Sequence, residues 1–425
     1  MKILVLTNLY PPHSMGGYER RCGDVVQGLR GKGHDVRVLT GTKGCRGRVI
    51  EGHVHRALGF FAGGGPWGLP FGKRLRLELR DNAYLRRLLN NFRPDVIHVW
   101  QGLNIAPSIV AAVRHSGVPV LFDISDYWVW LYNRGPIPPD AWVELWGRDA
   151  RHGYFRLAKR LARRALSSKI TLAHEPFTPE SCYFTSRALK GEYLANGYAV
   201  ADAPVIYCGI DVGRFAAGGR RERGGAFRLL CLGRMLADKG LHTAVEAVGL
   251  LYRRGARNVT LDLYGFETDP GYVEGLKKRA AELGLREAIR FPGFVPDGEM
   301  PEIYRSHDAF LFPSIWKEPF AVTPLEAFAA GIPVIGTASG GSGELLADGE
   351  NSLVFPAGDA AALAEKIWAL IGDPGLAARL TRNARALVGS AFTREVMIDR
   401  VEHTLAGLAG EGSSAPPRPE GRPVL

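Results

Sequence analysis

The stretch that most constrains the fold runs from residue 309 to residue 335. One apolar run ends at Phe312, and a second follows Gly331. Between them, Thr323 is suited to cap a helix, Pro324 to occupy its first position, and Gly331 to take the left-handed conformation at its end. Strand, loop, helix and strand in this order form the unit of a doubly wound parallel sheet. The chain is therefore predicted to have an α/β fold.

The start of this predicted helix is suited to an anion. Free backbone N–H groups and the helix dipole together favour negative charge there, so a diphosphate would bind well. We expect the substrate to contact Phe320, Ala321, Val322 and Thr323.

Two carboxylates frame the helix start, Glu318 in the loop and Glu326 inside the helix. Ionised oxygens accept hydrogen bonds from hydroxyl groups, so their natural partner is a sugar. A phosphate next to a polyol indicates a nucleotide sugar. Each residue also has a simpler interpretation, because Glu326 can close a capping box with Thr323 and Glu318 can be a solvated loop residue.

The surrounding pattern resembles the nucleotide-sugar site of family 4 of the retaining glycosyltransferases. In that family two Glu are separated by seven residues, and an Ala, a Gly-x-Pro-Val and a Gly-Gly-x-x-Glu turn follow. The matching residues here are Glu318, Glu326, Ala327, Gly331, Pro333, Val334, Gly340, Gly341 and Glu344. The resemblance implies the GT-B architecture of the glycogen-phosphorylase-like superfamily, with two Rossmann-like domains facing across a cleft. It also implies that Glu326 holds the ribose hydroxyls and Glu318 a sugar hydroxyl.

Length and composition agree with two domains, because 425 residues with 46% hydrophobic content can bury two ordinary cores. The five cysteines are scattered and odd in number, which favours a reducing compartment over a disulfide framework or a metal site. The first residues are too short an apolar stretch for a signal peptide, and no run approaches the roughly 18 apolar residues of a membrane span. We expect a cytoplasmic protein, either soluble or attached peripherally to the inner face of the membrane.

The excess positive charge belongs to the first half of the chain. Residues 1–205 contain 29 Lys and Arg against 16 Asp and Glu, whereas the whole chain has a net charge of +11. Much of the charge lies in residues 73–93 and 148–164, and the second stretch has the spacing of a basic amphipathic helix. Such a helix can be a solvated face, or it can favour anionic lipid or a lipid-diphosphate acceptor. No nucleic-acid-binding signature accompanies the charge, so nucleic acid is not an expected partner.

In the first domain, apolar strands alternate with helices, which implies a parallel sheet covered on both faces. Gly16 and Gly17 follow the first strand, where the backbone can approach a ligand closely. In the resembled family this loop faces the donor phosphates and the acceptor, so Gly16, Gly17 and Arg20 are candidate contacts. The expected strands are residues 2–7, 35–40, 95–100 and 118–123, and the expected helices are 18–33, 74–92 and 104–116.

Residues 123–146 are rich in aromatic side chains, which can stack on sugars or pack a loop onto the core. The resembled family often has His-Asp-Tyr-Trp at the end of the corresponding strand, with the His near the reacting sugar. This chain has Ser125 in place of that His, which puts any assistance by a His here in doubt. The neighbouring Asp126 is a candidate to accept a proton or orient the acceptor. His98, which ends another strand, is a second candidate, although a lone strand His is more often structural.

The crossing between the domains is expected at residues 205–226, which resemble the family's crossing and end in a Gly- and Arg-rich linker. An N-terminal acceptor-binding domain then covers residues 1–204, and a nucleotide-sugar-binding domain covers residues 227–392. A C-terminal helix at 393–410 can pack back on the N-terminal domain. The tail, residues 411–425, is expected to be disordered.

The second domain opens with a strand from Phe227 and a loop that carries Arg234 and Lys239, before a helix that Asp238 can cap. Either cation alone would be an ordinary exposed loop residue. Because they lie five positions apart beyond the carboxyl end of a strand, they can converge on one diphosphate. The residues that match the family's Gly-Arg-x-x-x-x-Lys-Gly motif and its base contact are Gly233, Arg234, Lys239 and Gly240, and Phe294 and Val295.

The resemblance implies transfer of a sugar, with retention of configuration, from a UDP- or GDP-linked donor to a hydroxyl of a saccharide or lipid-linked acceptor. Bacterial surface-glycan or glycolipid assembly is the expected setting. Arg234 and Lys239 would stabilise the charge that grows on the leaving diphosphate. The sequence has no Asp-x-Asp motif, so neither a metal nor another cofactor is expected. The alternatives are a sugar-nucleotide epimerase of the same fold and a non-catalytic sugar- or lipid-binding protein.

Overall fold

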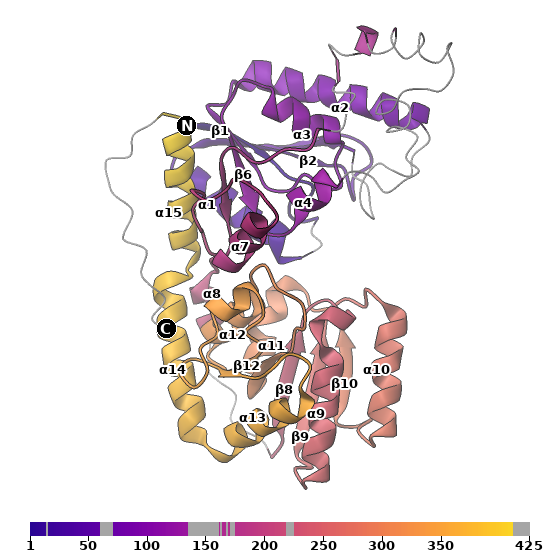
Figure 1. Cartoon of the computed structure of the whole chain (residues 1–425), viewed down its shortest axis with the longest axis vertical. Helices are drawn as coiled ribbons and strands as arrows, with labels where there is room; N and C mark the ends of the chain where they lie inside the picture. The colour runs from indigo at the N-terminus through magenta and orange to yellow at the C-terminus, as the bar shows by residue number, and fades with distance from the viewer. Residues whose placement is uncertain are drawn as a thin grey trace. The chain divides into compact units, whose positions relative to one another are not determined.

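The computed structural model describes residues 1–13, 16–59, 71–134, 175–217 and 225–410, together with residues 161, 164–166, 169 and 170. The chain divides into two compact units (Figure 1). Of the described residues, unit 1 contains those within 1–185, 190–206 and 398–410, and unit 2 contains those within 186–189 and 207–397. Each unit is built around its own sheet, as the apolar strand runs predicted.

The sheet of unit 1 has seven strands in the order β3-β4-β2-β1-β5-β6-β7. All neighbours are parallel except β3 and β4, which form an antiparallel pair at one edge. The central strands are buried on both faces, which explains their continuous apolar sequences. This edge pair was not predicted from the sequence. The strands are β1 (Lys2–Leu6), β2 (Asp35–Gly41), β3 (Val49–Glu51), β4 (Val54–Leu58), β5 (Val96–Val99), β6 (Val120–Ile124) and β7 (Cys182–Phe184).

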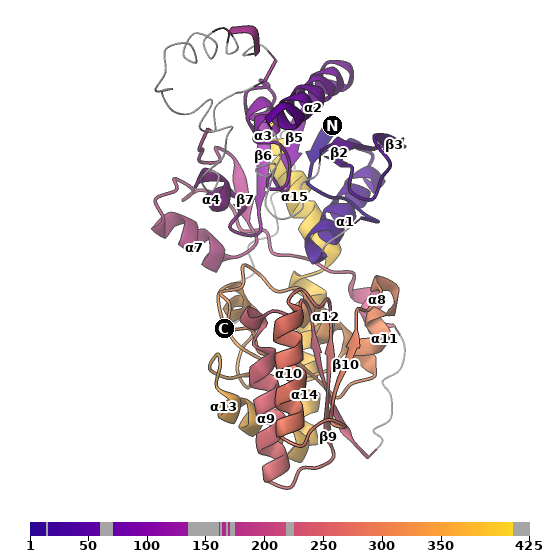
Figure 2. The same cartoon turned by 90° about the vertical axis from the view of Figure 1, so that its right-hand side faces the viewer.

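The long helices of unit 1 lie on opposite faces of its sheet, with α1 on one face and α2 and α3 on the other (Figures 1 and 2). The last helix, α15, begins in unit 2 and from Ile398 belongs to unit 1, where it lies beside α1. Gly28 permits this approach, because a Cβ there would lie 2.3 Å from Cδ1 of Ile398. The helices are α1 (Gly17–Gly31), α2 (Phe71–Phe92), α3 (Pro107–Arg114), α4 (Trp128–Asn133), α7 (Arg187–Ala195) and α15 (Arg394–Leu408).

The sheet of unit 2 has six parallel strands in the order β10-β9-β8-β11-β12-β13. Successive side chains of a strand enter different cores, so Leu229 packs with α9, α10 and α13, whereas Leu230 packs with α11, α12 and α14. Figure 2 shows α9 and α10 covering one face. The strands are β8 (Phe227–Leu232), β9 (Val259–Tyr264), β10 (Ile289–Gly293), β11 (Ala309–Phe312), β12 (Val334–Gly336) and β13 (Leu353–Val354).

The helices of unit 2 connect these strands. Three single turns of 3-10 helix, η2 (Ala237–Lys239), η3 (Asp297–Glu299) and η4 (Gly341–Glu344), lie in the loops. The α-helices are α8 (Val212–Ala216), α9 (Leu241–Arg253), α10 (Pro270–Glu282), α11 (Met300–Arg305), α12 (Thr323–Ala330), α13 (Ala360–Gly372) and α14 (Pro374–Ala391).

Two predicted helix caps were wrong. Thr323 is the first residue of α12 rather than its cap, because Val322 takes that position and no side chain caps the helix. Asp238 lies within η2 and does not cap α9, which begins after Gly240 in the left-handed conformation. Gly331 ends α12 with φ of 77°, as predicted.

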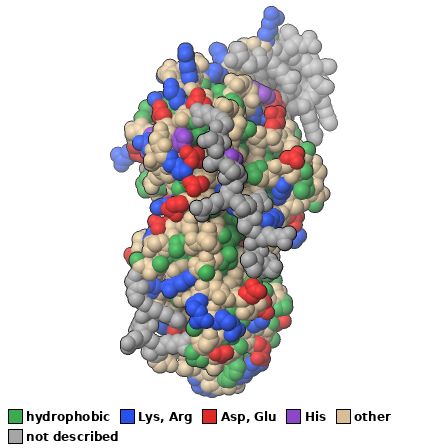
Figure 3. All heavy atoms as spheres, turned by 90° about the vertical axis from the view of Figure 1, so that its left-hand side faces the viewer, with side chains coloured by type: hydrophobic (Ala, Val, Ile, Leu, Met, Phe, Trp, Pro, Cys, Tyr) green, Lys and Arg blue, Asp and Glu red, His purple; other side chains and the backbone are tan. Residues whose placement is uncertain are grey.

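Of the two basic stretches, residues 73–93 are described, whereas most of residues 148–164 are not. Residues 148–160, Trp142, Trp146, the linker residues 218–224 and the tail from 411 lie outside the described residues. In α2, Arg74 is buried and pairs with Glu78 at 3.3 Å, so the first basic stretch is not simply a solvated face. On the face shown in Figure 3, cationic and anionic side chains are interspersed in both units. None of the helices in the described part of the chain is both long and apolar enough to cross a membrane.

Candidate functional site

The candidate donor site lies at the carboxyl edge of the sheet of unit 2. All six strands are parallel, so the loops after β8, β9, β10, β11 and β12 emerge at one edge. The chain order reverses between β8 and β11, which lie side by side. In doubly wound sheets, ligands bind at such a switch point. The loops after β8 and β11 carry the predicted residues Arg234, Lys239 and Glu318.

Lys239 and Glu318 meet at this switch point. The Lys239 ammonium donates to Oε1 of Glu318 at 2.6 Å, and the Ser314 hydroxyl donates to the same oxygen at 2.7 Å. The carbonyl of Asp238 accepts the N–H groups of Ile315 at 2.9 Å and Trp316 at 3.1 Å, which joins the two loops. Lys239 and Glu318 are 79 positions apart in the sequence, and their loops are thus joined by both main-chain and side-chain contacts.

Glu318 is not the solvated loop residue of the simpler interpretation, because only 8% of it is exposed. Both of its contacts use Oε1, and Oε2 bonds to none of the residues that the structure describes. One carboxylate oxygen therefore binds the protein, and the other is available to accept a hydrogen bond from a hydroxyl group.

Two glycines after β12 hold the main chain of Glu318. Gly340 has φ of 61°, and a Cβ there would lie 2.4 Å from the Glu318 carbonyl oxygen. A Cβ on Gly341 would lie 2.1 Å from the Pro319 carbonyl oxygen, and the Gly341 N–H donates to the Glu318 carbonyl at 2.7 Å. Only glycine allows such close approach, which gives the Gly-Gly pair a structural reason. Glu344 follows in η4 and accepts the N–H groups of Arg187 and Ala188 at the start of α7.

Glu326 is buried in the first turns of α12, with 3% of its surface exposed. Its Oε2 accepts the Tyr304 hydroxyl at 2.8 Å. Because Thr323 does not cap the helix, the capping-box interpretation of Glu326 was wrong. The N–H groups of Ala321 and Val322 donate to no described residue, so this helix start retains free donors for an anion. Beside them, Phe320 is buried and Thr323 is half-buried.

Arg234 has an exposed side chain and forms no ion pair with any residue in the described part of the chain. It follows Gly233, whose φ of 152° is open to glycine alone. The main chain is crowded here, since a Cβ on Gly265 would lie 1.6 Å from the Gly233 carbonyl oxygen. The Arg234 guanidinium is therefore carried on a closely packed loop while its charge remains uncompensated.

Phe294 is 56% exposed, directly after β10. It stacks on Phe266, which follows β9 and is 49% exposed, with ring centroids 4.2 Å apart. Two exposed, stacked rings at the carboxyl edge are suited to a planar base. Val295 is buried in the core beneath them, so its side chain supports this edge from below. Sequence analysis missed Phe266, although its position directly after the Gly265 turn was an available signal.

In unit 1, His98 is fully buried and both of its ring nitrogens are engaged. Trp100 Nε1 donates to Nδ1 at 3.1 Å, and Nε2 lies 3.1 Å from the Tyr183 hydroxyl. Burial, and secondarily the charge of Arg21, lowers the pKa of His98 to about 3. A neutral, enclosed ring fits the structural interpretation of His98 and gives no support to a catalytic one.

Asp126 follows β6 and is partly exposed. Its Oδ1 accepts the Trp128 N–H at 2.8 Å, and its Oδ2 accepts the Gln101 amide at 3.1 Å. Burial raises the pKa of Asp126 to about 6, although these two hydrogen bonds oppose the shift. A carboxylate with this pKa can exchange a proton near neutral pH. Gln101, which sequence analysis missed, is the side chain that orients it.

The glycine loop before α1 is open. Gly16 is exposed, and a Cβ at this position would meet nothing within 4 Å. The Gly16 N–H donates to Oε2 of Glu19 at 3.0 Å. A Cβ on Gly17 would lie 3.7 Å from the Arg20 guanidinium, so this loop and Arg20 share one surface. Among the described residues, no three His, Cys, Asp or Glu side chains gather in an arrangement that could hold a metal ion.

Two family models match the chain in succession. The model described as Glycosyltransferase Family 4 matches residues 15–214, and the model described as Glycosyl transferases group 1 matches residues 219–387. The chain belongs to glycosyltransferase family 4. The first match covers most of unit 1 of this glycosyltransferase, and the second covers the loops of the candidate donor site.

Relatives of this glycosyltransferase include full-length and partial matches. Glycogen synthase from Mycobacterium tuberculosis is 28% identical over 441 residues, which cover 99% of this chain and 98% of that protein. A lipopolysaccharide core biosynthesis glycosyltransferase from Rhizobium meliloti is 33% identical over 178 residues, which cover 42% of this chain and 49% of that protein.

Solved structures show the same fold. Sucrose-phosphate synthase from Thermosynechococcus elongatus has a TM-score of 0.70 at 19% identity, covering 97% of this chain and 100% of that one. HepE from Anabaena, solved in complex with UDP and glucose, has a TM-score of 0.67 at 21% identity, covering 96% and 100%. Both support the GT-B architecture of two parallel-sheet α/β domains for this glycosyltransferase.

Proposed function

We propose that this glycosyltransferase moves a sugar, with retention of configuration and without a metal, from a nucleotide diphosphate sugar to an acceptor hydroxyl. The observation that carries the proposal is the contact between Lys239 and Glu318 at the switch point of unit 2. It places a cation and a carboxylate with one free oxygen in one position. A nucleotide sugar needs both, a cation for its diphosphate and an acceptor for its hydroxyls.

Each donor-site residue then has a role. Arg234 and Lys239 stabilise the charge that grows on the departing diphosphate, which lowers the barrier because that charge is largest in the transition state. The start of α12, with the N–H groups of Ala321 and Val322, binds the same diphosphate. Glu318 accepts a hydroxyl of the transferred sugar, and Phe294 with Phe266 stacks on the base.

The remaining donor contact is with the ribose. Glu326, whose carboxylate lies at the start of α12, accepts hydrogen bonds from the ribose hydroxyls. In unit 1, Asp126 orients the acceptor hydroxyl or takes its proton, and the open loop of Gly16, Gly17 and Arg20 contributes to substrate binding.

The names of the relatives point to two settings for the reaction. One relative that matches over nearly its full length is named glycogen synthase, whereas two that match over part of their length are named for lipopolysaccharide core and colanic acid biosynthesis. We propose surface-glycan or glycolipid assembly in the cytoplasm, at the inner face of the membrane, with a UDP- or GDP-linked donor. Transfer of the sugar to a glucan acceptor would instead indicate an activity like that named for the glycogen synthase relative.

The test is a calorimetric titration of UDP, GDP, ADP and their sugar conjugates, with chelator present. The proteins are the wild type, Arg234→Ala, and Arg286→Ala as a control that removes an exposed Arg outside the site. We expect one nucleotide to bind without metal and to lose at least tenfold in affinity only in Arg234→Ala. Equal binding by all three proteins would refute the donor site.

Product analysis with the nucleotide sugar so identified then separates the alternatives. An epimerase converts the sugar with no acceptor present, and a binding protein forms no product. Transfer to an added acceptor, with an α or β product linkage matching that of the donor by NMR, supports the retaining transferase. The opposite anomer would overturn retention while leaving the transferase assignment in place.

A further inference from the structure

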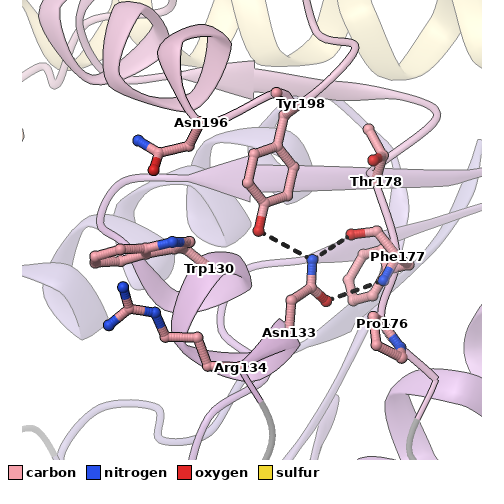
Figure 4. Close-up of a pocket in the computed structure, with 9 residues that line it drawn as sticks. Trp130, Asn133, Arg134, Pro176, Phe177, Thr178, Asn196 and Tyr198 are labelled. Carbon is pink, nitrogen blue, oxygen red and sulfur yellow. Dashed lines mark hydrogen bonds between the residues drawn. The ribbon is translucent and has the colours of Figure 1, made fainter.

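Unit 1 contains a cavity of about 480 Å³ that the donor site does not use. This volume falls within the range of small-molecule sites. Helix α4 supplies one wall with Trp130, Asn133 and Arg134, and residues 176–178 and 196–198 supply the others (Figure 4).

Asn133 fixes the shape of this cavity. Its Nδ2 donates to the Phe177 carbonyl at 2.7 Å and to the Tyr198 hydroxyl at 3.0 Å, and its Oδ1 accepts the Phe177 N–H at 2.9 Å (Figure 4). These bonds connect α4 to segments 44 and 65 residues further along the chain. The walls are therefore cross-linked, and the cavity exists before any ligand binds.

Arg134 lies over the indole of Trp130, with its guanidinium carbon 3.7 Å from the ring centroid (Figure 4). This stacking fixes the plane of the guanidinium and leaves its N–H edge able to bind a planar anion. Of the nine described residues that line the cavity, Arg134 alone is charged. Its side chain is exposed and pairs with no acidic residue in the described part of the chain.

Asp126 lies next to this wall. Its Oδ1 accepts the N–H of Trp128, the first residue of α4, and its main-chain oxygen accepts the Tyr193 hydroxyl at 3.1 Å. Tyr193 lines a smaller cavity of about 40 Å³, which shares Trp130, Asn196 and Tyr198 with the larger one. The Asp126 carboxylate is thus hydrogen-bonded to the start of α4, the helix that lines the cavity.

The chemistry of the walls identifies the ligand class. An indole face suits the apolar face of a sugar ring, amide and hydroxyl groups suit its hydroxyls, and a lone arginine suits a carboxylate or a phosphate. We propose that the cavity is the acceptor subsite and that it binds an anionic saccharide, with Arg134 selecting the charge. This inference rests on the proposed transferase function, for which it names the acceptor class.

The test measures binding of four probes by saturation-transfer NMR and calorimetry: methyl glucoside, glucuronate, glucose 6-phosphate and inorganic phosphate. The proteins are the wild type, Arg134→Gln, Trp130→Ala, and Arg87→Gln as a control for an exposed Arg on α2. We expect a charged sugar to bind the wild type at least tenfold more tightly than methyl glucoside. Arg134→Gln should remove this preference, Trp130→Ala should weaken all three sugars, and Arg87→Gln should change nothing.

Three outcomes would overturn the inference: equal binding of neutral and charged sugars, an unchanged preference in Arg134→Gln, or inorganic phosphate binding as tightly as glucose 6-phosphate. The comparison of glucuronate with glucose 6-phosphate decides whether the charge is a carboxylate or a phosphate. Titrations of UDP and GDP on the same samples report the donor site separately. If the wild type binds UDP or GDP but shows no preference for charged over neutral sugars, only the acceptor subsite is refuted. If the wild type binds neither nucleotide, the proposed function is refuted.

Discussion

Lys239 donates a hydrogen bond of 2.6 Å to Oε1 of Glu318, and this pair joins the loops after the two strands between which the chain order of unit 2 reverses. The contact gives the lysine a fixed position with only 20% of its side chain exposed. It also leaves Oε2 of the glutamate unused by the described residues. The two residues are therefore expected to serve different parts of one donor, the diphosphate and the sugar.

The first prediction separates these two roles. Lys239→Ala should lower affinity for both the nucleotide and its sugar conjugate and reduce kcat roughly 10²- to 10³-fold, because it removes a charge that acts in the transition state. Glu318→Gln should leave affinity for the free nucleotide unchanged and weaken only the sugar conjugate. Calorimetry with UDP or GDP and with the corresponding sugar conjugate measures both effects. Equal loss for the two ligands in Glu318→Gln would show that this residue does not contact the sugar.

The second prediction concerns Gly340. Gly340→Ala forces a Cβ to within 2.4 Å of the Glu318 carbonyl oxygen. Gly349 also has a positive φ, 76° against 61° for Gly340, but a Cβ there would meet nothing within 4 Å, so Gly349→Ala is the control. The clash should cost roughly 1–3 kcal/mol of stability beyond the control and should displace Glu318. Urea unfolding and calorimetry of the sugar conjugate test both parts. If the two variants unfold alike, the close packing of the loops is not needed for the site.

The third prediction concerns the exposed rings. Phe266→Ala and Phe294→Ala should each weaken nucleoside diphosphate binding by roughly 1–3 kcal/mol, the usual value of stacking between a base and an aromatic ring. Stability should change little, because both rings are about half exposed. Trp368→Ala removes an equally exposed aromatic side chain from α13 and serves as the control. Nucleotide affinity that falls in the control as well would argue against a specific base contact.

The parallel sheets and the donor loops were predictable because their signals are local. Apolar runs separated by helices specify buried parallel strands, and the carboxyl ends of such strands share one edge, so the loops that carry Arg234, Lys239 and Glu318 emerge at the same edge. The edge strands β3 and β4 were not predicted because they are short. Since β3 is also largely exposed, its sequence has no apolar run that would indicate a strand.

Other features depend on partners distant in the sequence. The burial of Glu326 against Tyr304 replaces a capping box, since the helix starts one residue earlier than the Thr-x-x-Glu spacing suggests. His98 lies at the end of a strand, where the sequence makes it a catalytic candidate. Its enclosure depends on Tyr183, which is 85 positions later in the sequence and therefore could not be inferred from the local pattern. The role of Phe266 likewise depends on its stacking with Phe294, which follows the neighbouring strand β10.

The fourth prediction is a pH dependence from Asp126. With its pKa raised by burial to about 6, the rate should fall as the pH decreases through about 6, provided that the ionised carboxylate is the active form. Asp126→Asn should lower the rate and abolish this acid limb. A pH profile of kcat/KM for both proteins is the measurement, and an acid limb that persists in the variant would assign it to another group.

The same shift has a consequence for stability. The folded-state pKa of Asp126 lies above the unfolded value of about 3.9, so the folded protein binds the proton more tightly. Ionisation therefore costs stability progressively between about pH 4 and 6, and fully above pH 6. Asp126→Asn should be more stable than the wild type at pH 8, and the difference should shrink at pH 4. A constant difference would mean that the variant acts through its hydrogen bonds instead.

The fifth prediction concerns Asp262, which is buried in β9 and accepts hydrogen bonds from Arg290 at 2.6 and 2.7 Å and from His307 at 3.0 Å. Burial alone would raise its pKa, but these bonds outweigh burial and lower it. The ionised form therefore stabilises unit 2 above about pH 4, and this contribution is lost as the pH falls through the folded-state pKa.

Asp262→Asn should accordingly lower the free energy of unfolding by roughly 2–4 kcal/mol at pH 7, because it leaves the buried His307 and the Arg290 guanidinium without an anion. The difference between the variant and the wild type should narrow as the pH falls through the lowered folded-state pKa of Asp262. Glu350→Gln, which alters an exposed acid, should track the wild type at every pH. Urea unfolding across this pH range tests the prediction, because a variant that stays equally destabilised in acid would show that the shape of the Asp262 side chain, and not its charge, stabilises the contacts with Arg290 and His307.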